Sequence, residues 1–563
     1  SFIILHSSLN TAPPTHPFRL HNRKPLRHLH QAMSQLDTPE QATPTAHPLS
    51  RAVIIAVLAA SAMVGGLAIS TQSYWIDEAL SLIVAMAPNP AEAWKFAQAV
   101  SGSTLQMPLY QVYLYGWHKF FGGGEWTMRA SNLPWFVLGQ LAFLLLLRNR
   151  SRLALLGCLL AAVCPILWVY LDETRPYIMQ YAAACWLTAA LLRLTANPPA
   201  SPLDGATIDQ TPHPLLPKSV LAVLAAATVV MLASSLLGVI WAGAFVLAFA
   251  VLVISGRSTR PAKQPALWLA GIVTLVLFLG FAAYYIFTWQ AAARGQFRGG
   301  LSLLSIPFIA YEFLGFAGFG PGKLQLRADP VGSLWSSAPA LLPLAAILAA
   351  LGLLALRQIR PRAWNKLAVT AWALALGLPT LAIFAAMFLF DHRALPRHFI
   401  PALPALLLIL AALLQQTFRQ KSVFWRSIAL LLPILWIASA FNLRWLPLHA
   451  KDDYRTASKL AAAALAANQE VWWAADSAAA YVYLTPVALE EVPGRAWAMQ
   501  APSWNNIRFK FPPRVIFISK PDIYDPQSAV ARYASENGFV PARKLQAFTI
   551  FTRKGEELPA VQP

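Results

Sequence analysis

Charged residues are scarce in this chain, and their scarcity excludes an ordinary soluble protein. Of 563 residues only 12% are charged and 57% are hydrophobic, against roughly 25% and 45–50% in soluble domains. Cysteine is scarce as well, because Cys158, Cys164 and Cys185 are the only three and all lie within apolar runs. Without CxxC pairs or Cys/His spacing, neither a disulfide framework nor a zinc site follows, and we expect small buried side chains.

Nucleotide-binding motifs are also missing. The chain has no GxGxxG or GxxxxGK[ST] sequence, so a nucleotide-binding domain has little support. Its 44 Lys and Arg against 24 Asp and Glu give a formal charge of +20. A basic chain can bind nucleic acid or an anionic membrane, so the location of the charges decides what they mean.

Long apolar runs are what the chain has in abundance. A bilayer core of about 30 Å requires roughly 20 apolar residues per helix, and eleven uncharged runs approach that length. We therefore predict a mainly α, polytopic membrane protein with about eleven transmembrane helices. The predicted spans are 52–70, 131–147, 153–171, 176–192, 219–236, 238–255, 265–288, 338–356, 367–389, 398–416 and 427–443. The fifth and sixth form one stretch, in which we expect a turn near Ser234 and Ser235.

The loops sort by charge. Those after the second, fourth, sixth, eighth and tenth spans are rich in Lys and Arg and hold two acids, Asp204 and Asp209. The positive-inside rule places these loops and the N-terminus in the cytoplasm. The excess charge then faces the anionic inner leaflet, and we predict no nucleic-acid partner. The acids of the membrane unit gather on the opposite face: Asp77, Glu78, Glu92, Glu125, Asp172, Glu173, Glu312, Asp329 and Asp391.

Composition divides the chain into three regions. Residues 1–51 are rich in Pro, His and Thr and are expected to be a disordered cytoplasmic tail. Residues 52–443 form the membrane unit, with outer-face loops 71–130 and 289–337, and 195–218 is a cytoplasmic linker. Residues 450–555 are expected to form a small α/β domain outside the membrane. Its predicted helices are Tyr454 to about Ala467 and 526–537, and its predicted strands are 470–475, 514–520 and 548–554.

Two outer features lie near the first span. The sequence WIDEALS (75–81) places Asp77 and Glu78 directly after it. The simpler interpretation is a solvated helix start, with Asp77 near an N-cap. Residues 106–121, which include Pro108 and Tyr110, are apolar and aromatic but short, so they are expected to form a helix lying in the membrane interface.

Two further features carry charges. The turn LDETRPY (171–177) holds Asp172, Glu173 and Arg175. Partly desolvated charges are costly unless they are paired, so a structural pair of Arg175 with either acid is the competing interpretation. The segment DHRALPRHFIPALP (391–404) precedes the tenth span, and its competing interpretation is interfacial snorkelling. Its charged or titratable residues are Asp391, His392, Arg393, Arg397 and His398.

Together these features place carboxylates from two loops and cations from a third on one membrane face. Carboxylates act as general bases, and Arg holds phosphate through a bidentate fork. The combination suits a reaction in which an acceptor is deprotonated while an anionic lipid phosphate leaves.

The order of these motifs resembles the family 39 membrane glycosyltransferases of the GT-C fold group, which includes protein O-mannosyltransferases and the lipid A aminoarabinose transferase. The matching pieces are DE after the first span, a PLY helix, GGEWTMR, ETRPY and RHFIPALP. They cover about residues 52–416, and KDDYRTASKLAAA (451–463) resembles the start of the C-terminal domain in bacterial members. The resemblance implies transfer of a sugar from a polyprenyl-phosphate carrier to a glycan, lipid or protein acceptor on the non-cytoplasmic face of the bacterial inner membrane. The C-terminal domain would then be periplasmic or extracellular.

The resemblance also implies residue roles. Asp77 matches the general base on the acceptor hydroxyl, and Glu78 the acid that orients it. Arg397 matches a contact to the carrier phosphate. Residues that match the E-x-R-P-Y turn and the P-P-L-Y helix are Glu173, Arg175, Pro176, Tyr177, Pro108, Leu109 and Tyr110. Further candidates for the phosphate are Arg393, His392, His398, Arg294 and Arg298.

Three positions depart from the family pattern. Gln106 and Met107 precede Pro108 where His-Pro-Pro or Lys-Pro-Pro is common, His398 replaces a Tyr, and Thr174 replaces an Ala. These changes bear on the acceptor or the carrier sugar and leave the reaction class as it is.

No cofactor is assigned with certainty. A monophosphate leaving group does not demand a divalent ion, but such an ion has candidate ligands in Asp77, Asp172, Glu173 and His392. A transporter or lipid flippase is the main alternative function, although its ionisable residues would be expected near the bilayer midplane. A sensor or assembly scaffold is a third.

Overall fold

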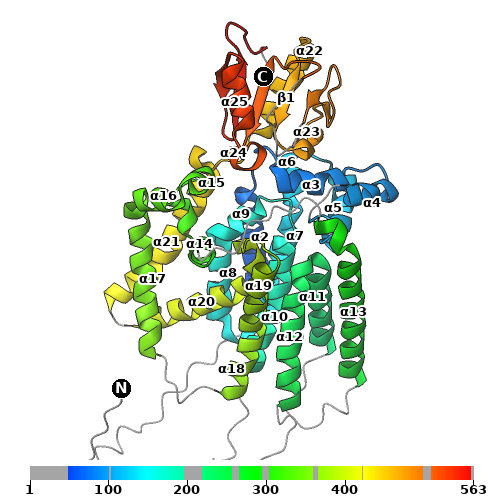
Figure 1. Ribbon diagram of the computed structural model, residues 1–563. Helices are drawn as coiled ribbons and strands as arrows, with labels where there is room; N and C mark the ends of the chain where they lie inside the picture. Colours follow the sequence, from blue (N-terminus) through cyan, green and yellow to red (C-terminus); the bar gives the residue numbers. More distant parts are fainter. Residues whose placement is uncertain are drawn as a thin grey trace, which may run out of the picture. The chain divides into compact units, whose positions relative to one another are not determined.

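The computed structural model describes residues 49–99, 103–195, 218–255, 265–293, 304–358, 365–420, 422–498 and 509–559. The predicted tail, as far as residue 48, and residues 196–217 of the predicted linker lie outside the described residues. Pro48–Pro563 is one compact unit. It consists of a bundle of long helices with a small sheet-containing domain at one end (Figure 1).

A helix, or two or three helical segments in direct succession, covers each predicted span. The helices are α2 (Arg51–Ala68), α7 (Asn132–Leu146), α8 (Ser151–Val163), α9 (Pro165–Leu171), α10 (Tyr177–Thr195), α11 (Lys218–Ser234), α12 (Leu236–Ser255), α13 (Pro265–Ala293), α17 (Ala338–Gln358), α18 (Lys366–Trp372), α19 (Leu378–Leu389), α20 (Leu403–Arg419) and α21 (Val423–Trp445). Among the described residues, seven helices are long and apolar enough to cross a membrane, or eight if one bent pair counts as a span. The protein is a multi-pass membrane protein, and eleven spans stay a prediction.

Two predicted spans are interrupted. The third breaks between α8 and α9 at Cys164, because Pro165 has no N–H for the preceding turn and its ring clashes there. The ninth contains a π-helical turn, Ala373–Gly377, between α18 and α19. The predicted turn near Ser234 and Ser235 is confirmed, since α11 ends at Ser234 and α12 begins at Leu236.

Small side chains hold the centre of the bundle together. Helix α10 is buried along most of its length and packs between α7 and α11. Gly139 of α7 faces Tyr181 and Cys185 of α10, so that a side chain at this position would press against both. Close backbone approach of this kind favours helix packing in lipid. All three cysteines are free and buried, as predicted.

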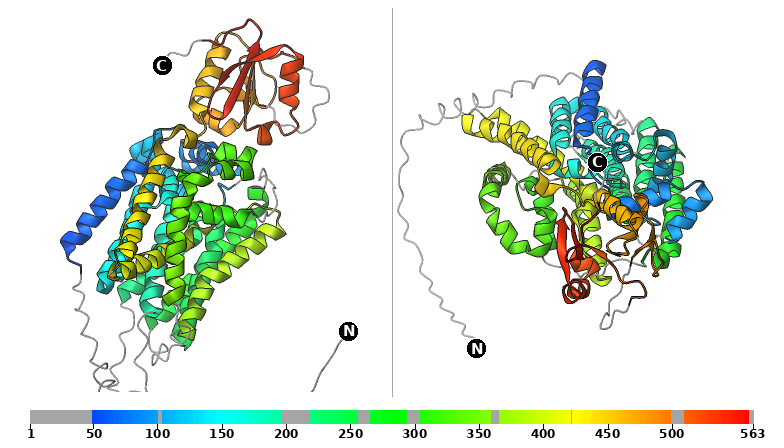
Figure 2. Two further views of the ribbon diagram at one scale, coloured as in Figure 1. Left: turned by 90° about the vertical axis from the view of Figure 1, so that its left-hand side faces the viewer. Right: turned by 90° about the horizontal axis from the view of Figure 1, so that it is seen from above.

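Short helices lie at the end of the bundle near the sheet domain (Figure 2). The predicted helix at 106–121 is present as α5, which packs against α3 and α11. Its position in the membrane interface stays a prediction. The short elements are α3 (Ile76–Ala85), α4 (Pro90–Ala99), α5 (Pro108–Phe121), α6 (Glu125–Ala130), α14 (Ser305–Phe313), α15 (Lys323–Ala328), α16 (Pro330–Ser336) and the 3₁₀ helices η4 (Phe316–Gly318) and η7 (Pro396–Ala402).

The C-terminal region contains a six-stranded mixed sheet of order β2-β3-β1-β4-β6-β5. Strands β2, β3, β1 and β4 are parallel, and β6 is antiparallel to β4 and β5. The strands are β1 (Val471–Ala474), β2 (Val487–Ala488), β3 (Ala496–Trp497), β4 (Val515–Ser519), β5 (Phe539–Lys544) and β6 (Phe548–Arg553). The helices are α22 (Tyr454–Ala466), α23 (Ser477–Val482), α24 (Pro521–Tyr524) and α25 (Ala529–Glu536).

Both faces of this sheet are covered. Trp473 and Phe517 pack with Tyr454 of α22 on one face, while Trp472 packs with Val530 of α25 on the other. Strands β1 and β4 are therefore buried throughout, which is why they are apolar without alternation. The five predicted elements are confirmed as α22, β1, β4, α25 and β6. Strand β5 was not predicted, because its sequence FVPARK is polar and exposed after Phe539.

Candidate active site

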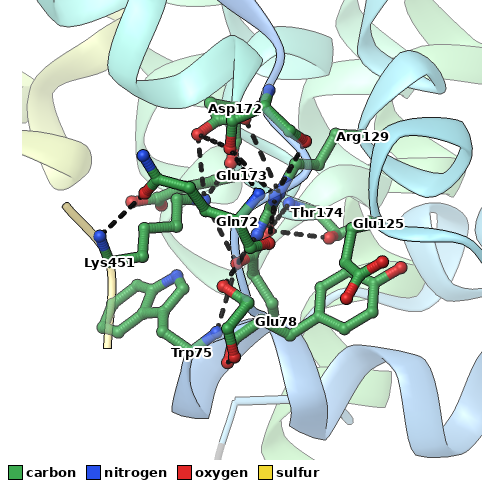
Figure 3. A network of polar contacts seen from close by, with 12 residues as sticks. Gln72, Trp75, Glu78, Glu125, Arg129, Asp172, Glu173, Thr174 and Lys451 are labelled. Atoms are coloured by element: carbon green, nitrogen blue, oxygen red, sulfur yellow. Dashed lines mark hydrogen bonds and ion pairs between the residues drawn. The ribbon is translucent and has the colours of Figure 1, made fainter. Parts of the chain in front are cut away.

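Glu78 is the centre of a buried network of ion pairs (Figure 3). Its two carboxylate oxygens accept hydrogen bonds from Nε and Nη2 of Arg129, both at 2.8 Å. The backbone N–H and the hydroxyl of Thr174 donate at 3.0 Å each, Lys451 Nζ at 3.2 Å and the Trp75 N–H at 3.3 Å. Burial alone would raise the pKa of Glu78, but Arg129 and Lys451 lower it to about 2. Glu78 is an ionised anchor that binds four segments of the chain together.

Asp172 extends this network to the end of α2. Its carboxylate accepts from the N–H of Ser70 at 2.5 Å and from the Ser70 hydroxyl at 2.9 Å. Arg129 Nε and Lys451 Nζ lie 3.7 and 3.4 Å from its oxygens. Arg129 also donates to the carbonyl oxygens of Ser70, Gln72 and Ser73. These contacts fix the loop between α2 and α3.

Asp77, the neighbour of Glu78, has different surroundings. Its Oδ2 atom lies 2.5 Å from Nη1 of Arg397, which is 320 residues further along the chain. The side chains of Asp77 and Arg397 remain 21% and 26% exposed. Burial would raise the pKa of Asp77, but the charges of Arg397 and Arg175 outweigh it and hold the pKa below its usual value. The structure thus joins two site residues that the sequence assigned to separate roles.

Arg175 supports α3 and pairs with neither acid of its own turn. Nη1 of Arg175 donates to the carbonyl oxygen of Asp77 at 3.2 Å and to the Ser81 hydroxyl at 3.0 Å, and Nη2 donates to the Ser103 hydroxyl at 2.5 Å. The competing interpretation, a structural pair of Arg175 with Asp172 or Glu173, is therefore wrong. Asp172 contacts other cations, and Arg175 finds its acceptors within α3 and in the loop before α5, which sequence order does not reveal. Tyr177 starts α10, with its ring edge-on to Tyr170.

A cavity open to solvent, about 730 Å³ including the open space, lies beside this network. Glu173, Glu312, Lys323 and His449 line its polar side, and residues of α2, α9 and α21 line its apolar side. The Glu173 side chain is 4% exposed, with Lys323 Nζ 3.9 Å away. Burial raises the pKa of Glu173, and burial also raises the pKa of Glu312 to about 7. The cavity therefore contains two carboxyl groups whose pKa lies above the usual value.

Three of the remaining predicted phosphate ligands, His392, Arg393 and His398, are described by the structure, and the other two lie outside the described residues. His392 is half-buried and Arg393 exposed, next to Asp391 with a positive φ of 54°. Nδ1 of His398 accepts a hydrogen bond from the Leu395 N–H at 3.2 Å and thereby caps η7. Arg294 and Arg298 fall in the stretch 294–303, outside the described residues. Their roles stay predictions.

Pro108 and Tyr110, the two site residues predicted on the interfacial helix, have roles in the folding and packing of α5. Pro108 is the first residue of α5, where a missing N–H costs nothing. Tyr110 is fully buried in a cluster with Leu82, Leu114 and Met179. Within the described part of the chain its hydroxyl has no hydrogen-bond partner.

The C-terminal domain reaches this region through residues that the sequence analysis missed. Besides Lys451, Tyr483 accepts from the Tyr74 N–H at 2.7 Å and donates to Glu125 at 3.2 Å. Arg455 pairs with Glu125 at 3.0 Å. Lys520 lies 5.8 Å from the ring centroid of Trp75, and Lys323 lies 5.7 Å from the same centroid. The only sequence signal was the charged KDDYR stretch directly after the last span.

Among the described residues, no group of three or more His, Cys, Asp and Glu side chains is arranged to hold a metal ion. The acids that were candidate ligands are engaged elsewhere: Asp172 binds Ser70, and Asp77 binds Arg397. The divalent ion considered from the sequence is left without an assigned site.

Fold and site define a helical multi-pass membrane protein with a C-terminal α/β domain and a polar, charged site between them. The chain is similar to ArnT from Cupriavidus metallidurans in the apo state, with 13% identity over 89% of this chain and 97% of that one and a TM-score of 0.49. It is also similar to that ArnT bound to undecaprenyl phosphate, with 14% identity, 91% and 100% coverage and a TM-score of 0.47.

A third similar structure is the Archaeoglobus fulgidus oligosaccharyltransferase AglB in complex with an inhibitory peptide and a dolichol-phosphate. Its identity is 14%, with 82% of this chain and 61% of that chain covered and a TM-score of 0.38. No protein-family model matches the chain, and a search of curated protein sequences finds no match either. The sequence motifs resemble the GT-C group of membrane glycosyltransferases.

Proposed function

We propose that the protein is an integral-membrane glycosyltransferase that moves a sugar from a polyprenyl-phosphate carrier to an acceptor hydroxyl on the non-cytoplasmic face. The observation that carries this proposal is the pair formed by Asp77 and Arg397. It combines a carboxylate and a guanidinium that are in contact and both partly exposed. A base and a phosphate ligand are the two groups that such a transfer requires.

The reaction would be a single displacement at the anomeric carbon. The acceptor oxygen forms a bond to that carbon while the bond from carbon to the phosphate oxygen breaks, and the electron pair leaves with the phosphate. Asp77 takes the proton of the acceptor hydroxyl. Arg397 stabilises the charge that develops on the phosphate, which favours the transition state over the ground state.

The roles of the other residues around the site follow from their contacts. Arg175 holds the backbone of Asp77 from the turn before α10. Glu173, Glu312 and Lys323 line the cavity beside the Glu78 network and offer polar groups to the hydroxyls of a sugar or acceptor. We place the cavity, the site and the C-terminal domain outside the cytoplasm, and the N-terminus inside, because of the loop charges.

Carrier-lipid analysis in a deletion strain tests the proposal and does not require the acceptor to be identified. Loss of the gene should cause one polyprenyl-phosphate sugar to accumulate, and the wild-type gene should restore its normal level. Asp77→Asn should fail to restore it although the protein is present in the membrane. The conservative variant Lys459→Arg, on an exposed face of α22, is the matched control and should restore it fully.

Two results would contradict the proposal. The first is an unchanged set of carrier lipids in the deletion strain. The second is carrier movement across the membrane by the purified protein with no release of sugar from the carrier, which would identify a flippase. Release of the sugar from the carrier by the purified protein supports the transferase.

A further inference from the structure

The contact between Asp77 and Arg397 conflicts with the two roles proposed for them. Nη1 of Arg397 lies 2.5 Å from Oδ2 of Asp77. While this pair is intact, the carboxylate of Asp77 is bound to a cation and cannot readily take a proton. The charge of Arg397, which would hold a phosphate, is neutralised by the same contact. Protonation of the paired carboxylate would leave the guanidinium without a counter-charge. The contact between Asp77 and Arg397 must therefore break before transfer takes place.

The surroundings indicate which group can move. The backbone of Asp77 is fixed, because Arg175 donates to its carbonyl oxygen. Its carboxylate, in contrast, makes its only hydrogen bond within the described residues to Arg397, and the side chain keeps a fifth of its surface exposed. Glu78 next to it is held by six donors and is fully buried. The side chain of Asp77 can rotate away at the cost of one contact.

Carboxylate and phosphate oxygens offer a guanidinium the same chemistry. Both accept charge-assisted hydrogen bonds from Arg, and phosphate can accept two in parallel. An anion that approaches Arg397 therefore competes directly with Asp77. The carboxylate has the charge and the acceptor atoms of the phosphate that the site is proposed to receive.

We propose that Asp77 occupies the place of the carrier phosphate on Arg397 in the donor-free protein, and that the phosphate of the lipid-linked donor displaces it. The inference rests on the proposed function. After displacement the guanidinium is still neutralised, and the released carboxylate lies beside a new negative charge that favours proton uptake. The base is thus free to act on an acceptor only once the donor is in place, which prevents its use without a sugar to transfer.

Reciprocity makes this exchange measurable without transfer. If phosphate binding breaks the pair, then a change that breaks the pair must strengthen phosphate binding by the same factor. Asp77→Asn keeps the size of the side chain and removes its charge. We expect it to bind undecaprenyl phosphate up to about fivefold more tightly than the wild type, since a partly exposed charged pair is worth about a factor of five or less.

The experiment is a double-mutant cycle on the full chain in lipid nanodiscs, with undecaprenyl phosphate as the titrant and native mass spectrometry as the readout. The proteins are the wild type, Asp77→Asn, Arg397→Ala and the double variant. Asp77→Asn should gain about fivefold when Arg397 is present and nothing when it is combined with Arg397→Ala. Glu92→Gln, which removes a partly exposed acid that pairs with Lys95, is the control and should leave binding within about twofold of the wild type.

Three outcomes would overturn the inference. Unchanged or weaker binding by Asp77→Asn would do so. A gain in affinity that persists without Arg397 would also do so, because it would come from the general loss of a negative charge that repels the phosphate. Absence of binding in every protein would overturn the carrier role in the proposed function and the exchange with it. Wild-type binding with no effect of Asp77→Asn leaves the proposed function intact and removes the exchange alone. If Asp77→Asn does not fold, Asp77→Ser provides the same comparison.

Discussion

Asp77 and Glu78 are adjacent in sequence and opposite in surroundings. Glu78 is fully buried and accepts from six donors on four segments, whereas Asp77 is partly exposed and bound through its carboxylate to Arg397 alone. Successive residues of a helix point about 100° apart, so one of the pair faces the protein and the other faces the site. An acidic pair in a sequence can thus contain one structural and one chemical residue, and four predictions test that division.

The largest expected effect is the loss of transfer in Asp77→Asn. A missing general base lowers the rate by about 10²–10⁴-fold, while loss of a partly exposed pair costs about 0–1 kcal/mol of stability. The comparison is made with labelled polyprenyl-phosphate sugar and by thermal unfolding of the same preparation. Wild-type transfer by Asp77→Asn would place the base elsewhere.

Glu78→Gln should show the reverse pattern. The change leaves the buried Arg129 and Lys451 with the more distant carboxylate of Asp172 as counter-charge, so the cost should approach that of a broken buried pair, about 3–5 kcal/mol. The melting temperature should fall by several degrees at a fixed scan rate, and transfer per folded molecule should stay within about tenfold of the wild type. An unchanged melting temperature together with lost transfer would make Glu78 part of the chemistry.

A smaller effect is expected for Lys451→Met, which removes the cation that the C-terminal domain inserts between Glu78 and Asp172. Two buried acceptors lose a donor, and we expect a loss of about 1–3 kcal/mol. Limited proteolysis should cut the segment 446–453 faster than in the wild type. Lys459→Met, on an exposed face of the same domain, is the control and should be cut at the wild-type rate. Equal cleavage of the two variants would show that Lys451 does not fix the domain to Glu78 and Asp172.

The smallest effect concerns pH. Burial raises the pKa of Glu312 to about 7 in the folded protein, so its ionised form opposes folding. The penalty is absent well below the ordinary pKa near 4.5, grows between about pH 4.5 and 7, and stays constant at higher pH. Glu312→Gln should therefore stabilise the protein by about 1 kcal/mol at pH 8, after allowance for partial exposure, and not at pH 4.5. The exposed control Glu536→Gln should show no such dependence, and a pH-independent difference would contradict a buried, titrating Glu312.

The sequence predicted the helices because lipid imposes a simple rule. Every backbone group must be satisfied within the membrane, so uncharged runs such as 238–255 become helices whatever their neighbours. Pro165 is a sequence signal for the break at Cys164, but the continuous apolar run around it led to the prediction of one unbroken span. In the C-terminal domain the apolar strands β1 and β4 were predicted, whereas the polar edge strand β5 was not.

The site was predictable only in part. Motif resemblance selected Asp77 and Arg397, and the structure brings them into contact across 320 residues. The partners of Glu78 were not predicted, because Arg129 and Lys451 lie 51 and 373 residues away and carry no local signal of pairing. A single sequence gives the type of a charged residue and not its counter-charge. The division between Asp77 and Glu78 is therefore a finding of the tertiary structure.

The most direct test of that division is the rate of sugar release from labelled polyprenyl-phosphate sugar per folded molecule, measured side by side for Asp77→Asn and Glu78→Gln. We predict that Asp77→Asn loses at least about a hundredfold and that Glu78→Gln, although less stable, stays within about tenfold of the wild type. Equal losses in the two variants, or a larger loss in Glu78→Gln, would contradict the assignment of chemistry to Asp77 and of structure to Glu78.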